Sequence, residues 1–472
     1  MLPPCGNMTY ATGWKFRKSY MADPRQADSF SMDGWTASDQ EPSVRFHYTC
    51  SRYGTFSETV TFPLIEQPLA SLVDNGLSAL LDLLQIALGV SYYKCAAARR
   101  LILNGASDQP EKLQLAAALY REGLAEFYVR NDLFQTHTLD IDPGINEQEY
   151  SSATTQLASL AGQALVAWGG GKDSYVADAI ARNAGLQPQR CSVVMSDKVA
   201  AAIQCTSDLA VLFLRRTLDP KLREVNAEGA LNGHVPITAI NSLMLVILGR
   251  FTGAHQVIFA NERSADEPTI QQDGIVANHQ YSKSSTFEGY LRAAITASDK
   301  VAPDYYSILR PFSEVWIARA FAKLTEAYPL FTSCNRNFQI IGEQSPRWCG
   351  DCAKCAFTSL LIAPHLTQQE ALNIFPDLFL NRANLLPLYR ELCGLTDKKP
   401  WDCVGTINEC RATLYKLASN PNWEDTLAVR TLAPEVSALH TPEELETFWQ
   451  EGLQATELHF VPDTLLKAAH DL

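Results

Sequence analysis

The chain has 472 residues and a net charge of −13, from 39 basic and 52 acidic residues. This acidic balance, and the lack of any Lys/Arg run longer than two residues, disfavours a nucleic-acid-binding protein. Hydrophobic residues make up 46% of the chain and charged residues 19%, as in an ordinary globular protein. We find no apolar stretch long enough to span a membrane and no N-terminal signal segment. We therefore expect a cytoplasmic protein with reduced thiols and no membrane contact.

The length allows two or three domains, and we predict an α+β domain over residues 1–150. Alternating residues over 43–48 and 56–62 predict a β-hairpin that is either structural or a lid over a substrate. Apolar residues at helical spacing follow, and the second predicted helix runs from Leu113 to Tyr128. We expect Glu122 and Glu126 to lie on the surface of that helix rather than to contact a substrate.

The central domain, predicted over residues 151–362, is organised around residues 163–184. A short apolar run leads into Gly169, Gly170 and Gly171, then into Lys172, Asp173, Ser174 and a segment with helical spacing. Glycines let a backbone approach a phosphate, and a helix N-terminus offers it free N–H groups. Lys172 adds a positive charge and Ser174 a hydroxyl. Asp173 fits an anion site if a cation such as Mg²⁺ bridges it to the phosphate. The alternative is an ordinary glycine turn before a helix.

Polar side chains follow the predicted strands of this domain. In a parallel sheet, ligands collect at the carboxyl ends of the strands. One strand ends at Met195 and Ser196, and a later strand ends in a polar loop with Asn261, Glu262 and Arg263. Residues 276–284 combine His279, Tyr281 and Lys283, a diversity that favours function over a plain surface loop. Arg215 and Arg216 could hold a phosphate or a carboxylate, or form the solvated face of a helix.

Three cysteines in a C-x₂-C-x₂-C pattern, Cys349, Cys352 and Cys355, follow Cys334. Four thiolates can close a tetrahedral zinc site, which leaves no open position for catalysis by the metal. An iron–sulfur cluster and a reduced, metal-free cluster are the alternatives. We expect the other downstream cysteines, Cys403 among them, to be core residues. Residues 363–472 are predicted to form a helical region that serves as an appendage or a dimer surface.

The glycine loop from Gly169 to Ser174 resembles the PP-loop, S-G-G-x-D-S, of the ATP pyrophosphatase family, with Gly169 in place of the family's Ser. The resemblance implies an α/β fold, a parallel sheet with helices on both faces. It also implies that ATP is cleaved between its α and β phosphates and that AMP passes to a substrate oxygen. The loop would bind ATP, with Lys172 on the phosphates and Asp173 on Mg²⁺, while Met195 and Ser196 would meet the adenosine. The cysteines resemble the zinc site of 7-cyano-7-deazaguanine synthase, another PP-loop enzyme, with a longer first spacing.

A more specific resemblance spans most of the chain. Eight blocks carry it: GVSYYK (from Gly89), EGLAEFYVRN (from Glu122), WGGGKDS (from Trp168), LNGHVPITAINS (from Leu231), ANERSA (from Ala260), NHQYSKS (from Asn278), SCNRNF (from Ser333) and WCGDCAKC (from Trp348). They resemble the MurL family, the UDP-N-acetylmuramoyl-L-alanyl-L-glutamate epimerases of bacterial peptidoglycan synthesis. The resemblance implies that ATP adenylates a carboxylate of the terminal L-glutamate. A base then removes the acidified Cα proton, reprotonation occurs on the other face, and hydrolysis releases AMP and the D-glutamyl product.

The residue types suggest roles for this reaction. His279 and Lys283 are the candidate base and acid, with His234 as a rival. Arg215 and Arg263 are candidates for the substrate's carboxylates or diphosphate, and Asn261, Glu262 and Tyr281 complete the expected substrate contacts. The implied partner is the small-molecule UDP-sugar dipeptide, and a homodimer is possible.

Two other functions remain open from the residues. One is a different PP-loop adenylating enzyme, such as an amide or nitrile synthase or a tRNA-modifying ligase, although the acidic charge argues against tRNA. The other is a non-catalytic nucleotide sensor, which would bind ATP without releasing pyrophosphate.

Overall fold

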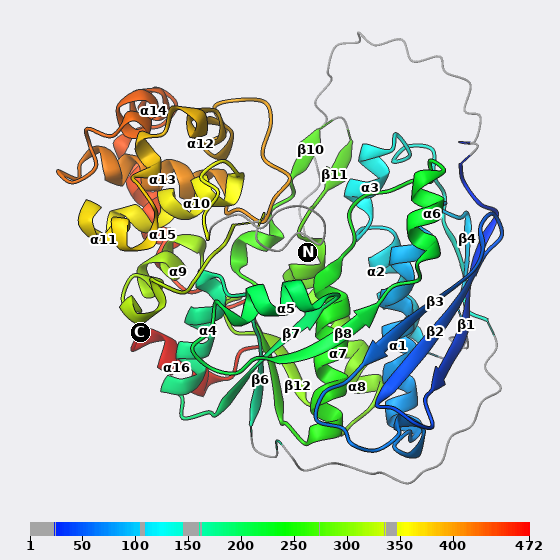
Figure 1. The fold of residues 1–472 in the computed structure, drawn as a ribbon. Helices are drawn as coiled ribbons and strands as arrows, with labels where there is room; N and C mark the ends of the chain where they lie inside the picture. Colours follow the sequence, from blue (N-terminus) through cyan, green and yellow to red (C-terminus); the bar gives the residue numbers. More distant parts are fainter. Residues whose placement is uncertain are drawn as a thin grey trace, which may run out of the picture.

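The computed structural model describes residues 23, 25–103, 109–144, 160, 163–272, 274–334, 336 and 347–472. A ten-stranded sheet forms its centre, in the order β12-β9-β6-β7-β8-β3-β2-β1-β4-β5 (Figure 1). The strands are β1 (Ser29–Ala37), β2 (Ser43–Cys50), β3 (Gly54–Thr61), β4 (Arg100–Ile102), β5 (Asp140–Asp142), β6 (Ala164–Ala167), β7 (Pro188–Val194), β8 (Leu212–Thr217), β9 (Gln256–Phe259) and β12 (Asp304–Ser307). A separate two-stranded ribbon pairs β10 (Ile270–Gln272) with β11 (Ile275–Ala277).

Five neighbouring strands, β8, β7, β6, β9 and β12, are all parallel. From β6 the chain adds β7 and β8 on one side, then returns to add β9 and β12 on the other. The order therefore reverses between β6 and β9, which is the position where open α/β sheets bind ligands. Since the carboxyl ends of parallel strands share an edge, the loops after β6, β9 and β12 open at one edge of the sheet.

Helices cover both faces of the parallel strands, as their alternating side chains require. Leu165, Val257 and Tyr305 belong to one core, together with residues of α1 (Asn75–Tyr93), α7 (Ile237–Thr252) and α8 (Ser285–Ser298). Their neighbours in sequence, Val166, Ile258 and Tyr306, belong to a second core with α4 (Lys172–Asn183) and α9 (Glu314–Phe321). The α/β class predicted from the sequence is confirmed.

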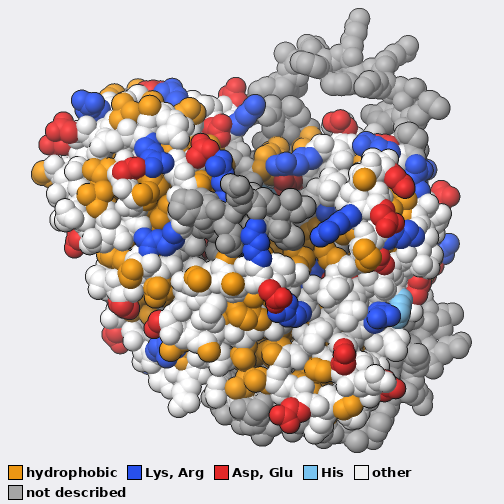
Figure 2. Space-filling model, viewed as in Figure 1, with side chains coloured by type: hydrophobic (Ala, Val, Ile, Leu, Met, Phe, Trp, Pro, Cys, Tyr) orange, Lys and Arg blue, Asp and Glu red, His pale blue; other side chains and the backbone are white. Residues whose placement is uncertain are grey.

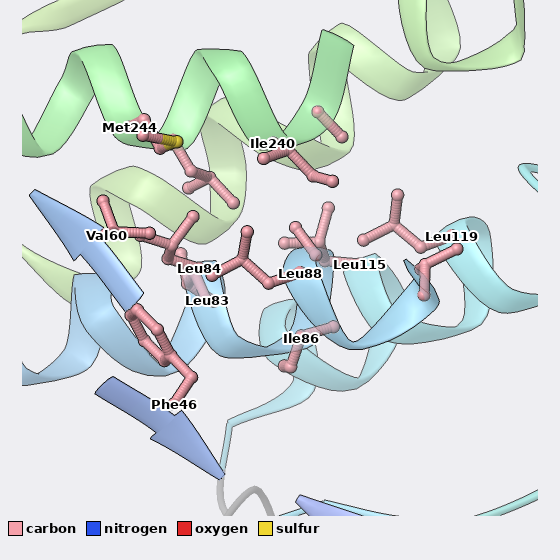
Figure 3. Packing of buried hydrophobic residues seen from close by; sticks show 14 of the residues in the cluster. Phe46, Val60, Leu83, Leu84, Ile86, Leu88, Leu115, Leu119, Ile240 and Met244 are labelled. Carbon is pink, nitrogen blue, oxygen red and sulfur yellow. The ribbon is translucent and has the colours of Figure 1, made fainter. Parts of the chain in front are cut away.

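The predicted N-terminal hairpin is confirmed and extends the same sheet. Strands β2 and β3 pair antiparallel from Ser43 with Thr61 to Cys50 with Gly54, and Gly54 adopts a positive φ of 73° at the turn. Strand β3 then pairs antiparallel with β8, so the hairpin continues the parallel half. Figure 3 shows Phe46 and Val60 of this hairpin against Leu84 and Leu88 of α1, with Ile240 and Met244 of α7 beyond them. The division into three domains at residues 150 and 362 stays a prediction.

Two local expectations were wrong. The helix predicted over 113–128 is two helices, α2 (Pro110–Tyr120) and α3 (Ala125–Arg130). Gly123 lies in the break, where an added Cβ would lie 2.6 Å from the Leu119 carbonyl oxygen. Arg215 and Arg216 lie on strand β8 rather than on a helix, because hydrogen bonding to β3 and β7 takes up this segment. Arg216 is buried and pairs with Glu58 at 2.7 Å.

The remaining helices include those predicted for the region after residue 363. They are α5 (Asp197–Gln204), α6 (Lys221–Ala227), α10 (Ala353–Ile362), α11 (Gln368–Ile374), α12 (Leu386–Leu392), α13 (Ile407–Ala418), α14 (Leu427–Ser437), α15 (Pro442–Gly452) and α16 (Asp463–His470). The helices after residue 363 gather beside the parallel strands, and α16 returns to pack on α4 (Figure 1). Among the described residues, only α1 is long and apolar enough to cross a membrane, and 89% of its apolar window is buried inside the fold.

Candidate active site

The glycine loop lies at the carboxyl end of β6, where the strand order reverses. Gly170 has a φ of +75°, and a Cβ there would lie 2.0 Å from Thr206 Oγ1, so only glycine fits. Gly171 caps α4, and Ser174 Oγ accepts the Gly169 N–H at 3.0 Å. The N–H groups of Gly170, Gly171 and Lys172 donate no hydrogen bond to any described residue. Three aligned donors at a helix N-terminus form a cradle suited to an anion.

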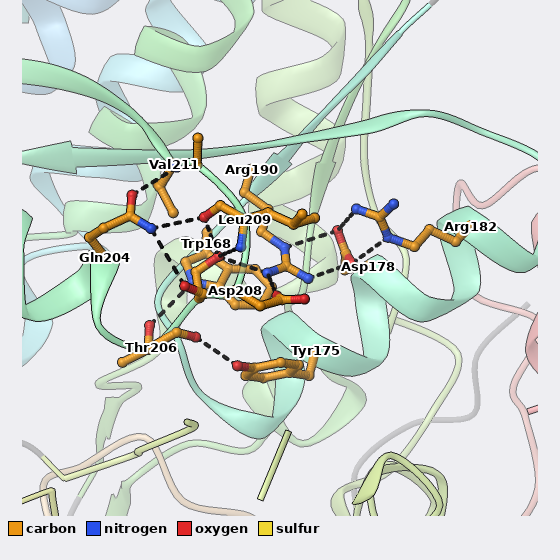
Figure 4. A network of polar contacts seen from close by, with 12 residues as sticks. Trp168, Tyr175, Asp178, Arg182, Arg190, Gln204, Thr206, Asp208, Leu209 and Val211 are labelled. Carbon is orange, nitrogen blue, oxygen red and sulfur yellow. Dashed lines mark hydrogen bonds and ion pairs between the residues drawn. The ribbon is translucent and has the colours of Figure 1, made fainter. Parts of the chain in front are cut away.

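A network of polar contacts between side chains of the flanking elements fixes this loop (Figure 4). Thr206 accepts the Trp168 indole N–H at 3.3 Å, and its carbonyl accepts the Tyr175 hydroxyl at 2.7 Å. Arg190 stacks on the Trp168 ring at 3.9 Å and pairs with Asp178 at 3.0 Å. The loop is therefore fixed from both of its flanking elements, β6 and α4.

A lysine–carboxylate cluster lies beside the loop and consists of Lys172, Asp173, Glu262 and Glu314. The Lys172 ammonium, only 2% exposed, pairs with Asp173 and with Glu314 at the start of α9. Burial disfavours this charge, but the two carboxylates outweigh burial and raise the pKa of Lys172 above its ordinary value. Burial raises the pKa of Glu314 to about 8, with Lys172 opposing the shift and Asp173 and Glu262 adding to it. Asp173 and Glu262 thus offer carboxylates that a divalent cation could bridge to a phosphate, and Glu314 could join them by losing its proton to the bound cation.

His279 forms a second centre beside this cluster. Its Nδ1 hydrogen-bonds Glu126 Oε2 at 2.5 Å, and the His234 ring lies 4.6 Å from the His279 ring between centroids. Burial opposes protonation of His279, but the hydrogen bonds to Cys403 and Glu126 raise its pKa to about 9. Burial lowers the pKa of His234 to about 4. At neutral pH the first histidine is therefore a cation and the second is neutral. Glu126 is 4% exposed, so its predicted surface position was wrong.

Cys403 joins the two centres. Its thiol lies close enough to His279 and Lys283 to raise the pKa of both. Burial raises its pKa, but the cations Lys283, His279 and Lys354 outweigh burial and lower it to about 7. The expectation that Cys403 is a core residue was wrong, since it is half-buried and belongs to neither hydrophobic core, whereas Cys393 and Cys410 lie in the second core as expected.

The loop that carries Cys403 is fixed to α9. It ends at the capping box of α13, in which the Thr406 N–H donates to Glu409 at 2.7 Å. The other carboxylate oxygen of Glu409 accepts the Glu314 N–H, also at 2.7 Å. The buried side chain of Glu409 therefore connects the loop of Cys403 to Glu314, the residue that pairs with Lys172.

Arg310 is a buried residue that connects two loops of the same region. It is 1% exposed, pairs with Glu288 at 3.1 Å, and donates to the carbonyl oxygens of Glu262 and Lys283. It thereby holds the loop after β9 against the turn that carries Lys283.

The other predicted site residues are dispersed. Asn261 donates to Ser307 at 2.8 Å, and Arg263 donates to the carbonyls of Glu451 and Gln454 in the C-terminal region. Burial raises the pKa of Tyr281, whose ring packs on Phe287.

Three further predicted residues belong to strands β7 and β8: Met195 and Ser196 follow β7, and Arg215 lies on β8. Met195 is 39% exposed, and Ser196 caps α5. Arg215 is half exposed and pairs with the exposed Asp197. No described contact brings Arg215 to the lysine–carboxylate cluster.

Cys334, Cys349, Cys352 and Cys355 come together as predicted. Their sulfur atoms lie within 4.8 Å of one another, which makes a candidate metal site compatible with structural zinc. The site adjoins the glycine loop, since the Thr332 N–H donates to the Gly170 carbonyl at 3.0 Å. On the other side, α10 begins at the cysteines and carries Phe357, whose ring lies 5.9 Å from the Lys172 ammonium.

Comparison with known proteins assigns the family. The family model of the MurL N-terminal domain matches residues 21–308, and that of the MurL C-terminal domain matches residues 330–447. The chain belongs to the MurL family. A relative from Micromonospora sp. is 37% identical over 447 residues, covering 93% of this chain and 95% of the relative. A relative from Salinispora tropica is 37% identical, covering 93% of this chain and 93% of the relative. A relative from Xanthomonas oryzae pv. oryzae is 36% identical, covering 86% of this chain and 89% of the relative.

Each of these relatives is named UDP-N-acetyl-alpha-D-muramoyl-L-alanyl-L-glutamate epimerase. No solved structure matches the chain. Three separate blocks that resemble the MurL family meet at the second centre: Glu126 comes from the first, His234 from the next, and His279 and Lys283 from the third. The loop of Cys403 lies outside all of these blocks, which is why sequence reasoning missed it.

Proposed function

We propose that this MurL protein epimerises the terminal L-glutamate of UDP-N-acetylmuramoyl-L-alanyl-L-glutamate, and that ATP activates the substrate as an acyl-adenylate. The observation that carries the proposal is the meeting of two centres at one edge of the sheet. Asp173, in the glycine-lined helix N-terminus suited to phosphate, raises the pKa of Lys283, and Cys403 raises the pKa of both Lys283 and His279, so the two centres are close enough to interact. Activation and proton transfer would thus occur side by side.

Activation answers a chemical difficulty. A free carboxylate is already negative and stabilises an adjacent carbanion poorly. When the glutamate carboxylate attacks the α-phosphorus of ATP, pyrophosphate leaves and an uncharged acyl carbon remains beside Cα. The Cα–H is then more acidic, and cations can stabilise the enolate oxygen that forms on its removal. Hydrolysis after reprotonation releases AMP and the D-glutamyl product.

The residues of the glycine loop fit ATP. The N–H groups of Gly170, Gly171 and Lys172 would bind phosphate oxygens, and Ser174 could add its hydroxyl hydrogen, since its oxygen already accepts the Gly169 N–H. Mg²⁺ would neutralise phosphate charge, held by Asp173 with Glu314 as a second candidate ligand. The Lys172 ammonium would then pass from these carboxylates to the phosphates. Met195 and Ser196 remain the candidates for adenosine contact.

Proton transfer would fall to the second centre. His279, held protonated by Glu126 and Cys403, is suited to deliver a proton to the enolate. Burial lowers the pKa of Lys283, but the neighbouring Cys403 and Glu262 outweigh burial and raise it. Lys283 is therefore suited to stabilise negative charge more than to act as a base. His234 is neutral at pH 7 and remains a rival acceptor. The four cysteines would hold a structural zinc ion that supports the glycine loop.

The substrate is a multiply charged anion, so it needs positive charge near the site. Figure 2 shows Lys and Arg side chains, with some acidic ones among them, on the face between the C-terminal helices and the strands, although the whole chain carries −13. Such local positive charge attracts a diphosphate in spite of the net charge. Arg263, Tyr281 and Asn261 are the candidate contacts nearest the central loops, and Arg215 is a peripheral one.

The test uses the UDP-sugar dipeptide, ATP and Mg²⁺ in D₂O. Pyrophosphate and AMP are followed with time, and the glutamate is then analysed for chirality and for deuterium at Cα. The proposal expects AMP together with a deuterated D-glutamyl product. AMP without inversion would indicate an adenylating ligase that lacks its acceptor, and nucleotide binding without pyrophosphate release would indicate a sensor.

A further inference from the structure

We infer that a cavity beside α3 binds the uridine diphosphate part of the proposed substrate. The inference rests on the proposed function and names a site that the family assignment leaves open. The cavity has a volume of about 290 Å³, close to the lower end of the roughly 300–1,000 Å³ that small-molecule sites occupy. Its wall includes four aromatic side chains, those of Tyr120, Tyr128, Phe134 and His137.

Contacts within the protein fix the aromatic wall. The Tyr128 and His137 rings stack, with 4.8 Å between their centroids and 23° between their planes. The Tyr128 hydroxyl donates to the Tyr120 carbonyl at 2.7 Å. Both ring nitrogens of His137 have partners, since Nε2 lies 3.0 Å from the Tyr93 hydroxyl and Nδ1 lies 2.8 Å from Gln26 Nε2. Because their polar atoms are bonded within the fold, the two rings offer the cavity apolar surface on which a nucleobase can stack.

The rim of the cavity carries a cation for the diphosphate. The Arg121 side chain is exposed and donates to the Leu139 carbonyl at 3.3 Å. A guanidinium has five N–H donors in a planar fork, so further donors remain for phosphate oxygens. Val276 of β11 also lines the cavity, with its apolar side chain 56% exposed. An apolar wall with an arginine at its rim matches a nucleoside joined to a diphosphate.

The cavity shares two elements with the second centre. Tyr128 lines the cavity from α3, and Glu126 of the same helix hydrogen-bonds His279. Val276 lines it from β11, three residues before His279, and α3 packs on β11 (Figure 1). In the proposed substrate a diphosphate, a sugar and an alanine separate the uridine from the glutamate, so the uridine should bind outside the centre. A cavity that adjoins the centre and is not lined by His234 or His279 meets this requirement.

A larger cavity, between the loop after β9 and the C-terminal helices, suits a diphosphate less well. Its volume is about 480 Å³. The carboxylates of Glu267, Glu409 and Glu451 line it, together with the cation Arg263 and one aromatic ring, that of Phe448. Three carboxylates repel a diphosphate, and one ring offers less stacking surface than four. We therefore assign the uridine diphosphate to the cavity beside α3.

The experiment titrates UDP itself into the full-length protein and measures its dissociation constant by calorimetry. Val276→Glu places a carboxylate at the cavity, Arg121→Ala removes the cation at the rim, and Arg121→Lys keeps the charge. Val301→Glu is the matched control, because Val301 is a similarly exposed valine (60%) in the turn between α8 and β12, outside the cavity. All three side chains are exposed, and melting temperatures show that each variant is folded.

We expect UDP to bind the wild type and Val276→Glu to weaken that binding by about 10-fold or more, because a carboxylate beside a diphosphate repels it. Arg121→Ala should weaken binding by a similar factor, and Arg121→Lys should keep part of it. Val301→Glu should bind UDP as the wild type does. The KM for the UDP-sugar dipeptide should rise in step with the dissociation constant of UDP, while ATP binding stays unchanged.

Three results would overturn the inference. The first is that the wild type does not bind UDP. The second is that Val276→Glu and Val301→Glu bind UDP equally well. The third is that Gly170→Ala abolishes UDP binding while Val276→Glu keeps it, since UDP would then occupy the glycine loop and not the cavity beside α3.

The same data separate this inference from the proposed function. If the wild type binds UDP through the cavity but does not invert the glutamate, the epimerase proposal fails and the cavity remains a uridine diphosphate site. If the wild type inverts the glutamate and Val276→Glu leaves the KM for the UDP-sugar dipeptide unchanged, the inference fails while the proposed function stands.

Discussion

At the scale of single residues, the site depends on groups whose behaviour is set by immediate neighbours. Lys172, His279 and Cys403 are three examples, each pushed away from its ordinary pKa in opposition to burial by an opposite charge. Strongly shifted groups gathered at the carboxyl edge of a parallel sheet indicate a functional site more than a structural one. Three predictions belong to this scale.

The first concerns Gly170. In Gly170→Ala, the Cβ must displace Thr206, and the positive φ adds about 1 kcal/mol of backbone strain. We expect pyrophosphate release to fall by about 100-fold, because the phosphate donors move. Gly185→Ala is the matched control, since Gly185 has a φ of +80° but nothing within 4 Å of the added Cβ. Equal rates for the two variants would refute a close-fitting cradle.

The second concerns the pair of Glu126 and His279. In Glu126→Gln we expect the pKa of His279, about 9 in the wild type, to fall by about one to two units on losing the carboxylate, as read from the imidazole NMR titration. Glu122→Gln is the control, because that glutamate is exposed. An unchanged titration in Glu126→Gln would contradict the assigned hydrogen bond.

The same pair sets a pH window for stability. The raised pKa of His279 means that its contribution is complete below the unfolded value of 6.5 and is lost as the pH rises through about 9. The lowered pKa of Glu126 means that its contribution is lost as the pH falls below the unfolded value of 4.5. Denaturant melts should therefore find the wild type most stabilised over Glu126→Gln between about pH 4.5 and 6.5, with the difference shrinking toward pH 9. A difference that grows with pH would contradict the pairing.

At the scale of elements, the fold works by fixing loops against one another. The four-cysteine site connects the segment that ends at Cys334 to the start of α10. That segment contacts the glycine loop through Thr332, and α10 contacts Lys172 through Phe357. Arg310 likewise ties the loop after β9 to the turn that carries Lys283. Catalytic loops held by a second layer of contacts keep their geometry more closely than free ones.

For the cysteine site, we predict that Cys352→Ser loses about one zinc ion per chain and melts at a lower temperature, because a tetrahedral structural site needs all four ligands. ATP binding should weaken as well, since Thr332 loses its support beneath Gly170. Metal analysis, thermal melting and nucleotide titration measure the three effects. Cys205→Ser should leave all three unchanged, and the same result for Cys352→Ser would rule out a structural metal.

For Arg310, we predict that Arg310→Met lowers the free energy of unfolding by about 3–5 kcal/mol, because Glu288 is left buried without its partner. The double variant Arg310→Met/Glu288→Gln should recover part of that stability, since the uncompensated charge is gone. It should not recover activity, because the carbonyls of Glu262 and Lys283 still lack their donor. Denaturant titration and the epimerase assay separate the two effects, and recovery of full activity would show that Arg310 is only a stabilising residue.

At the scale of the whole molecule, the helices and strands were predicted correctly where the sequence is periodic. The hairpin, the strand–glycine–helix unit and the C-terminal helices follow local patterns, and the four cysteines met as their spacing indicated. The second centre could not be predicted in full, because Glu126, His279 and Cys403 lie far apart in sequence and meet only through the complete fold. Glutamate is the residue type typical of a helix surface, yet Glu126 lies after the break at Gly123, is 4% exposed and is paired with His279. Burial and partners, which decide the pKa, are properties of tertiary packing.

The central claim is that a substrate carboxylate oxygen attacks the α-phosphorus of ATP. The most direct measurement uses the UDP-sugar dipeptide with ¹⁸O in its glutamate carboxylates, ATP and Mg²⁺, followed by mass analysis of the nucleotide. The account predicts one ¹⁸O in each AMP formed, in step with D-glutamyl product, because the bridging oxygen stays with AMP when water attacks the acyl carbon. Unlabelled AMP, or ADP and phosphate in its place, or inversion without nucleotide consumption, would contradict it.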